Sequence, residues 1–481
     1  MITIRRYIVA WLRYHMLYTD FITPASIQGS LHYGSDTYEQ SYRPLRILYA
    51  MALLERLNDL IWSFPLLVLL MGTHIYFTIK LHFPQRNLLY ALKLSIGKAD
   101  NTGQNLSPFS ALATTLAATL GTGNIIGVST AVALGGPGAI FWCWLTGILG
   151  MATAYSECYL SVLFRSRNAA GDYVGGPMYV LKNGLHNKFL GGIYAACTLI
   201  AAFGVGCTTQ ANSVTQAAMD SFHLSPHLVG ILLAFLTGIV VLGDVKSIAN
   251  ICERTVPAIS FVYLFGCLLL LILYRKVLPA ACLLIIKDAF SFVSIAGGVA
   301  GAALQRAVRY GIARGLFTNE AGIGTSSIAA AASHVAEPRI QAYVSMTAVF
   351  WDTVVMCLIT GLVIVANMLY DPASVMGVAE TGLTAAAFRH LPYIGDSFLT
   401  VSLAAFAVTT LIGWSYFGEK ATEYLIGKKG IPLYKLAYIV MIYLGAIIPM
   451  RLVWESTDLI NAVMVLPNVL ALFCLRNHIR E

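Results

Sequence analysis

The chain has 481 residues, of which 58% are hydrophobic and only 11% are charged, and its formal net charge is +8. Soluble domains carry about 25% charged residues, so this composition excludes an ordinary soluble protein and indicates a polytopic membrane protein. The positive charge does not indicate nucleic-acid binding, because basic residues of membrane proteins gather in loops according to topology. The nine cysteines lie in or beside apolar runs without CxxC spacing, so we expect neither disulfides nor cysteine metal ligands.

Residues 1–50 differ from the rest of the chain. They are rich in Tyr and Arg and contain no continuous apolar span. Residues 1–16 could form a basic helix at the membrane interface. We favour the alternative that residues 1–50 are a nonessential extension, disordered or added by a start assigned too far upstream, and that residues 51–481 form the membrane domain.

Windows of about 20 apolar residues predict membrane-spanning helices. Eleven such windows follow, with approximate bounds 59–79, 109–134, 139–164, 189–219, 227–243, 254–274, 289–304, 341–369, 396–418, 433–450 and 456–475. If the last span ends inside, 20 of the 26 Lys and Arg residues after Met51 fall in inside segments, among them Arg306, Arg309 and Arg314. Basic residues favour the cytoplasmic side, so we expect a cytoplasmic C-terminus, an N-terminus outside and a protein of the cell inner membrane.

Glycines interrupt two of the predicted spans. Residues 121–127 have the sequence GTGNIIG in the second span, and Gly297 and Gly298 interrupt the seventh. Interrupted membrane helices are tolerated only where the freed backbone lines a cavity. If the first span is set aside, each break falls in the first helix of a five-helix half, which is typical of inverted-repeat transporters. The sequence therefore predicts an all-α polytopic fold of two inverted five-helix repeats plus one extra N-terminal helix.

Two half-helices meet at such a break. One offers free N–H groups with a partial positive charge, and the other offers free carbonyls. A zwitterion needs both, so we expect Thr122, Gly123 and Asn124 to bind a carboxylate and Gly297 to lie near an ammonium group. The alternative is that the glycines only allow close helix packing, and at Gly297 both interpretations stay open. A dinucleotide-binding loop is excluded because no strand precedes the glycines.

Polar side chains within the apolar spans mark further candidates. Gln210, Asn212 and Ser213 lie in the middle of one span, where they either face the cavity or hydrogen-bond neighbouring helices. Trp414 and Tyr416 either gate the cavity or anchor their helix at the membrane interface.

Four threonines could form an ion site. Thr409 and Thr410 are adjacent in an apolar span, and hydroxyl and carbonyl oxygens are hard ligands that suit Na⁺. Thr119 and Thr122, at the first break, could face them. The alternative is that each hydroxyl bonds back to a carbonyl of its own helix.

The main acidic residues within the spans are Glu157 and Asp352. A carboxylate inside a membrane is by default a candidate for a proton relay or an ion site. For Glu157, the alternative is an ion pair with Arg165 or another basic residue of an inside loop. Residues 314–322 are expected to form a structured loop or gate. No HExxH, GxSxG or nucleophile–base pattern is present, so we expect no enzyme.

Several longer motifs follow one another along the chain. They are GTGN with the Gly-Val pair at 127–128, GGPGAIFW at 135–142, GMAT at 150–153 with Glu157, GGPMY at 175–179, RGLFTNEAG at 314–322 and GWSYFGE at 413–419. Together they resemble the sodium:alanine/glycine symporter family, over residues 60–475. Cys143, Ala154 and Cys207 depart from the Met, Lys and Asn that we expect in that family.

The resemblance implies a LeuT-type fold and symport of alanine or glycine with Na⁺, or with H⁺ as in some members. It implies a substrate site near Thr122, Gly123 and Asn124, lined by Gln210 and Trp414. By analogy with that fold, Na⁺ would bind carbonyls near Thr119 and Thr122 and the hydroxyls of Thr409 and Thr410. We expect Na⁺ as coupling ion without another cofactor, and a monomer in the lipid bilayer.

Three rival functions stay open on the sequence. A proton-coupled symporter of the same fold would use Asp352 or Glu157 as its relay. A passive channel or facilitator would conduct solute without accumulating it. A membrane enzyme would need a nucleophile–base pair or a metal cluster, and the sequence contains neither.

Overall fold

The computed structural model describes residues 56–480, except residues 57, 59–60, 63, 97–105, 244, 291–298 and 449. Residues from Leu57 to Glu481 form one compact unit. The predicted interfacial helix at 1–16, the boundary after residue 50 and the break at Gly297 lie outside the described residues.

The unit consists almost entirely of helices, as predicted. In chain order the helices are α4 (Phe64–Lys80), α5 (Leu88–Ile96), α6 (Pro108–Thr119), α7 (Ile126–Gly135), α8 (Ala139–Leu163), α9 (Pro177–Tyr179), α10 (Lys188–Phe203), α11 (Thr209–Phe222), α12 (Pro226–Val241), α13 (Val245–Leu273), α14 (Leu278–Ala289), α15 (Val299–Asn319), α16 (Ser326–Ala331), α17 (Pro338–Val349), α18 (Leu358–Tyr370), α19 (Leu383–Phe388), α20 (Gly395–Ile426), α21 (Ile431–Ile447) and α22 (Met450–Cys474).

Shorter segments join some of these helices. A 3₁₀ turn, η2 (Thr122–Asn124), lies between α6 and α7. Two π-helical segments, η4 (Gly204–Thr208) and η5 (Phe350–Cys357), connect α10 to α11 and α17 to α18. A two-stranded antiparallel hairpin, β1 (Ser166–Arg167) and β2 (Tyr173–Val174), follows α8. Segments of π-helix frequently mark functional sites.

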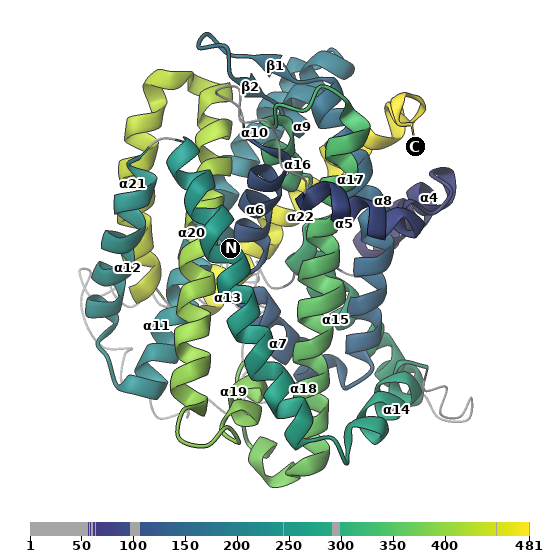
Figure 1. Cartoon of the computed structure of the whole chain (residues 1–481), viewed down its shortest axis with the longest axis vertical. Helices are drawn as coiled ribbons and strands as arrows, with labels where there is room; N and C mark the ends of the chain where they lie inside the picture. Colours follow the sequence, from purple (N-terminus) through teal and green to yellow (C-terminus); the bar gives the residue numbers. More distant parts are fainter. Residues whose placement is uncertain are drawn as a thin grey trace, which may run out of the picture. The chain divides into compact units, whose positions relative to one another are not determined.

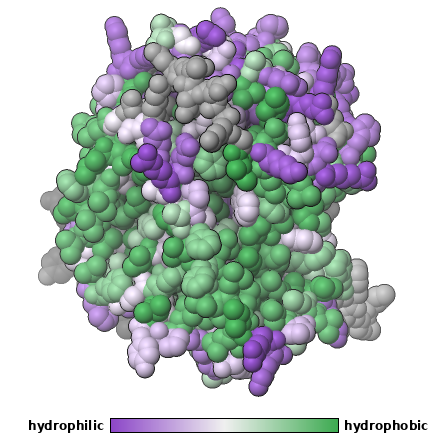
Figure 2. Space-filling view, viewed as in Figure 1, coloured by the Kyte–Doolittle hydropathy of each residue, from purple (hydrophilic) through white to green (hydrophobic). Residues whose placement is uncertain are grey.

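Six helices among the described residues are long and apolar enough to cross a membrane, and up to eight spans result if each of two bent helix pairs counts as one. Figure 2 shows an apolar band across the visible face, with hydrophilic side chains gathered toward both ends. This pattern confirms a helical membrane protein with several spans.

The seventh predicted span is wrong in its position. The helix in this region is α15, which continues to Asn319 instead of ending near residue 304. Arg306, Arg309 and Arg314 therefore lie within a helix and not in an inside loop. A hydropathy window misses α15 because its arginines and glycines reduce the mean hydropathy of an otherwise helical segment.

Helix α8 lies at the centre of the packing, between α15 and α17. Glycines permit this close approach: a Cβ added at Gly147 would lie 2.8 Å from Cγ2 of Thr353, and one added at Gly311 would lie 2.8 Å from Cβ of Trp142. Farther out, α10 packs on α20 and α12 packs on α21. Small residues at such contacts are how membrane helices pack without a hydrophobic driving force between them.

Two helix pairs, α6 with α7 and α15 with α16, are each separated by a short break. The α6 axis is bent by 59° relative to the segment that follows the break. Figure 1 shows the chain descending through α6 and α7 and ascending through α15 and α16. The two broken pairs therefore run in opposite directions. Their α6 and α16 ends are tied together, since the Leu106 amide donates to the Ala332 carbonyl over 3.1 Å.

Candidate functional site

The first break lies at residues 120–125, where every side chain is buried. Ser107 caps α6 by accepting a hydrogen bond from the Ser110 amide, and Pro108 occupies the first turn, so the start of this helix is well defined. Its end is not a normal cap. The Oδ1 atom of Asn124 accepts a hydrogen bond of 3.0 Å from the Gly121 amide, which the interrupted helix leaves free.

Asn124 also joins the break to the π-helical segment η5. Its Nδ2 atom donates to Oδ1 of Asp352 over 2.7 Å, and Oδ2 of Asp352 accepts from the Thr353 hydroxyl over 2.6 Å. The sequence makes Asp352 a candidate proton relay or ion site but does not predict its position beside Asn124. The structure brings it to the first break. A π-bulge is not visible in the local sequence, which explains why this contact was missed.

The backbone of the break approaches its neighbours closely. A Cβ added at Gly123 would lie 2.8 Å from Cγ2 of Thr318 on α15, and one added at Gly121 would lie 2.7 Å from Oγ1 of Thr410 on α20. Neither position can accept a side chain without a shift of its surroundings. The glycines therefore allow this part of the backbone to lie close to α15 and α20.

Gln210 belongs to this region. Its Oε1 atom accepts from the Thr122 amide over 3.3 Å, and its Nε2 atom donates to the Val205 carbonyl over 3.2 Å. Asn212, by contrast, turns to α21, where its Nδ2 atom donates to the Gly445 carbonyl over 3.1 Å. Of the two alternatives, Gln210 faces the break and Asn212 joins neighbouring helices.

Trp414 lies one helical turn from Thr410 on α20 and is 1% exposed. It packs on the π-helical segment η4, because Gly206 has no side chain and a Cβ there would lie 2.8 Å from Cδ2 of the indole. The Nε1 atom of the indole is buried and has no hydrogen-bond partner. Tyr416 is also buried, so both rings lie inside the helix bundle and the alternative of an interfacial anchor is wrong for both residues.

The four threonines behave differently from one another. The Thr410 hydroxyl donates across to the Leu120 carbonyl at the break over 3.2 Å. The Thr409 and Thr119 hydroxyls donate to carbonyls of their own helices, at Phe406 over 2.8 Å and at Thr115 over 3.2 Å. The Thr122 hydroxyl is buried without a partner. Oxygen atoms thus gather at the break, but two of the four hydroxyls bond back as the alternative interpretation described.

A second break separates α15 from α16 at residues 320–325. Glu320, Gly322 and Gly324 all have positive φ angles, of 55°, 94° and 93°. A positive φ is unusual for a glutamate and indicates backbone held by its surroundings. The sequence analysis interpreted this stretch as a loop or gate. Its glycine spacing, AGIGT after a polar Asn-Glu pair, is the signal that could have identified it as the partner of GTGNIIG.

Glu157 lies at this second break and not beside Arg165, so the alternative interpretation, an ion pair with Arg165, is wrong. Its Oε1 atom accepts from the Gly322 amide over 2.8 Å and from Nδ2 of Asn468 on α22 over 2.7 Å. Arg165 lies just after the end of α8 and contacts other groups. Its guanidinium donates to the Ser333 carbonyl over 2.6 Å and lies 3.7 Å from the centre of the Tyr173 ring.

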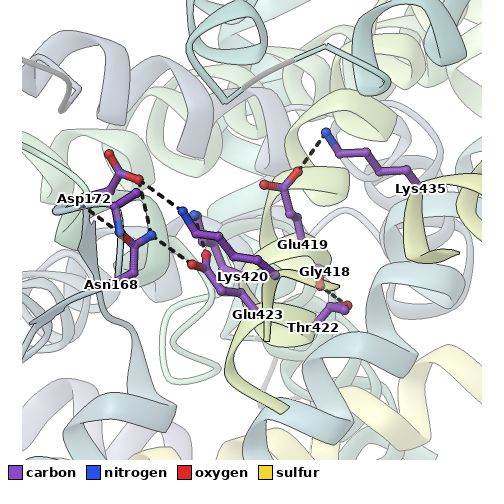
Figure 3. Close-up of polar contacts among 10 residues, drawn as sticks. Asn168, Asp172, Gly418, Glu419, Lys420, Thr422, Glu423 and Lys435 are labelled. Carbon is purple, nitrogen blue, oxygen red and sulfur yellow. Dashed lines mark hydrogen bonds and ion pairs between the residues drawn. The ribbon is translucent and has the colours of Figure 1, made fainter. Parts of the chain in front are cut away.

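A polar cluster connects the hairpin to α20 and α21, and Figure 3 shows its side chains. Nζ of Lys420 lies 2.8 Å from Oε2 of Glu423, and Nζ of Lys435 lies 3.2 Å from Oε2 of Glu419. Nδ2 of Asn168 donates to Oε1 of Glu423 over 2.9 Å. We call Asn168, Asp172, Glu419, Lys420, Glu423 and Lys435 the hairpin cluster.

The chain matches one protein family over nearly its full length. The model of the sodium:alanine symporter family matches residues 48–481. The sodium/alanine symporter AgcS of Methanococcus maripaludis is 42% identical over 432 residues, which cover 88% of this chain and 94% of the relative. The probable sodium/glutamine symporter GlnT of Bacillus subtilis is 35% identical over 421 residues, which cover 87% of each chain.

Among solved structures, the chain is similar to a Na⁺-coupled sialic acid symporter in a substrate-bound outward-open state. The TM-score is 0.55 at 13% sequence identity, and the match covers 86% of this chain and 88% of the other. At this identity the likeness shows the fold alone. The two chains therefore share their fold.

Proposed function

The chain belongs to the sodium:alanine symporter family, which is a family of transporters and not of enzymes, and we propose that it imports alanine or glycine together with Na⁺. The observation that carries the proposal is the first break, where bare backbone, an amide side chain and a threonine hydroxyl meet in a buried region. Such breaks in membrane helices bind small solutes and ions.

We propose that the fold has two inverted five-helix repeats and eleven spans. The first repeat would begin with the α6–α7 pair and the second with the α15–α16 pair, and α4 would precede both. The opposite directions of the two broken pairs support this arrangement. The protein would be a monomer in the inner membrane, with its C-terminus in the cytoplasm, as the Lys and Arg distribution favours.

The substrate carboxylate would bind at Thr122, Gly123 and Asn124. Oε1 of Gln210 accepts a hydrogen bond from the backbone N–H group of Thr122. A substrate carboxylate could replace this oxygen and accept the same hydrogen bond. Trp414 would close one wall, and Gly297 would leave room near the ammonium group. A site walled by backbone favours a small side chain, which supports alanine or glycine over larger amino acids.

Na⁺ would bind between the first break and α20. The Leu120 carbonyl and the Thr410 hydroxyl are 3.2 Å apart there, and Thr119, Thr122 and Thr409 would complete the oxygen ligands after rotation of their hydroxyls. One charge that crosses about 100 mV supplies about 2.3 kcal/mol. A roughly tenfold Na⁺ gradient adds about 1.4 kcal/mol, so one Na⁺ supports roughly 500-fold accumulation of a neutral solute.

Ligand binding to the purified protein tests this assignment. We expect alanine to bind only in the presence of Na⁺, glycine to compete, and glutamine to compete at least tenfold more weakly. Equal competition by glutamine would overturn the small-substrate assignment. Asn124→Leu should abolish alanine binding while the protein still inserts in the membrane, because it removes the hydrogen bonds of Asn124 to the Gly121 amide and to Asp352.

A further inference from the structure

Several basic side chains gather where α4, α5 and the end of α22 meet. Helix α4 ends at Lys80, and the 3₁₀ turn η1 (Pro84–Asn87) leads into α5, which is bent by 67° from α4. The segment after α22 lies beside them, because Nζ of Lys80 donates to the Arg476 carbonyl. The rings of Tyr76 and Phe473 lie 5.0 Å apart and join α4 to α22. Figure 1 shows α4, α5 and the C-terminus on the same side of this unit.

Two tyrosines connect further basic residues to the same place. The Tyr155 hydroxyl donates to the Arg480 carbonyl over 2.8 Å, and the rings of Tyr155 and Tyr343 lie 5.0 Å apart. The Tyr343 hydroxyl accepts from Nδ2 of Asn87 in η1 over 3.0 Å, and the guanidinium of Arg339 lies 5.8 Å from the centre of the Tyr343 ring. We use the name basic corner for six residues of these segments: Lys80, Arg86, Lys93, Arg339, Arg476 and Arg480.

Few carboxylates are available to balance these charges. Residues 61–96 and residues 459–480 contain no Asp or Glu. The acids next to the basic corner in the sequence are Glu337, which lies near Arg339, and Glu481. Among the described residues, no member of the basic corner forms an ion pair with a carboxylate. The basic corner therefore keeps an excess of positive charge.

Large apolar side chains share the exposed surface of η1 and α5 with these bases. Leu89 and Ile96 are 76% and 79% exposed, and Arg86 and Lys93 are exposed between and before them. Positions 86, 89, 93 and 96 follow one another at spacings of three and four residues, which places them on one face of a helix. A helix that exposes apolar and basic side chains suits the membrane interface. There the apolar groups enter the lipid, while Lys and Arg extend toward the headgroups.

We infer that the basic corner binds the headgroup of an anionic phospholipid. Basic pockets between membrane helices are suited to such headgroups, and an arginine can bind a phosphate through two parallel N–H groups. Arg86 and Arg476, which are exposed close to the end of α4, would contact the phosphate. The apolar side chains of α5 would contact the acyl chains, which a soluble anion lacks. None of these residues belongs to the proposed substrate or Na⁺ sites, so lipid binding does not depend on the proposed symport.

The test uses the purified full chain in a neutral detergent. Dioleoylphosphatidylglycerol, which is anionic, or dioleoylphosphatidylcholine, which is zwitterionic, is added, and native mass spectrometry measures the binding of each lipid. We expect phosphatidylglycerol to bind at least about 30-fold more tightly. Arg86→Gln and Arg476→Gln should each lower this preference about fivefold, and the double variant about 25-fold, because each base contributes separately. Arg476→Gln keeps the backbone carbonyl that Lys80 binds.

Lys276→Gln is the matched control, because Lys276 is an exposed base in the connection between α13 and α14, away from the basic corner. It should keep the wild-type preference. Equal binding of the two lipids by the wild type would overturn the inference, and so would an unchanged preference in the double variant or an equal loss in Lys276→Gln. Displacement of phosphatidylglycerol by inorganic phosphate would assign the basic corner to a soluble anion instead and would also overturn it.

Discussion

Two groups of buried acids in this molecule differ in their partners. In the hairpin cluster, Glu423 lies 2.8 Å from Lys420 and Glu419 lies 3.2 Å from Lys435. At the two breaks, Glu157, Glu320 and Asp352 are at most 3% exposed, yet among the described residues none of them pairs with Lys or Arg. Their hydrogen bonds come from neutral groups: a backbone amide, hydroxyls and two asparagines.

The difference separates structure from transport. A buried acid next to a buried lysine is permanently neutralised. The Glu419–Lys435 pair joins α20 to α21, and Asn168 joins the hairpin to Glu423 of α20. A buried acid that has only neutral donors needs a cation or a proton from solution, and such residues inside membranes mark ion and proton pathways. The hairpin cluster is therefore expected to hold the fold together, and the breaks to carry charge.

The largest effect is expected at the first break. Gly123→Val should reduce alanine uptake by at least about 100-fold, because overpacking of a tight region costs about 3 kcal/mol. Uptake is measured alongside the amount of protein in the membrane. Gly127→Ala is the matched control, since a Cβ added at Gly127 meets nothing within 4 Å. It should stay within about twofold of the wild type. Normal transport by Gly123→Val would place the site elsewhere.

The hairpin cluster should affect stability more than transport. Lys420→Met leaves Glu423 buried and unpaired, which is expected to cost about 3–5 kcal/mol of unfolding free energy. The double variant with Glu423→Gln should recover at least half of this loss, because both charges are then gone. Thermal unfolding in detergent measures both. Lys428→Met, at an exposed pair with Asp172, should cost at most about 1 kcal/mol.

The threonines of α20 sharpen the description of the Na⁺ site. Thr410→Val removes the hydroxyl that contacts the break, so the Na⁺ concentration for half-maximal uptake should rise about tenfold, which corresponds to about 1.4 kcal/mol. Thr409→Val removes a hydroxyl that bonds within its own helix, and its effect should be smaller. A larger increase in the Na⁺ requirement for Thr409→Val than for Thr410→Val would contradict the proposal that Thr410 contributes more to Na⁺ binding than Thr409.

The smallest effect is expected where Arg165 lies over the Tyr173 ring. Tyr173→Leu removes this cation–π contact, which is worth about 0.5–1 kcal/mol at an exposed position. Thermal unfolding should show a small decrease, and the Na⁺ dependence of uptake should not change. A change in Na⁺ dependence would indicate that the hairpin takes part in transport and would weaken the division between the two regions.

Much of this arrangement could be predicted from the sequence. Long apolar windows predict helices that cross a membrane, and Gly, Thr and Asn in the middle of one window predict the first break. The expected neighbours Thr122, Gln210 and Thr410 do lie at this break. These features depend on composition and local order, which a sequence displays directly.

Other features depend on long-range packing and could not be predicted. Helix α15 carries arginines and glycines, so hydropathy predicts a span that ends near residue 304 and gives no sign of the break at residues 320–325. The π-helical segment that turns Asp352 toward Asn124 has no local signal. The sequence does not reveal the partners of Glu157, because Gly322 and Asn468 are separated from it by 165 and 311 residues.

Alanine uptake into proteoliposomes tests the central proposal most directly. Three conditions are compared: an inward Na⁺ gradient, an inward H⁺ gradient with no Na⁺, and no gradient. The account predicts that alanine accumulates above its external concentration only when the Na⁺ gradient is present. Accumulation driven by H⁺ alone would contradict Na⁺ coupling, and equilibration without accumulation under every condition would indicate a passive facilitator.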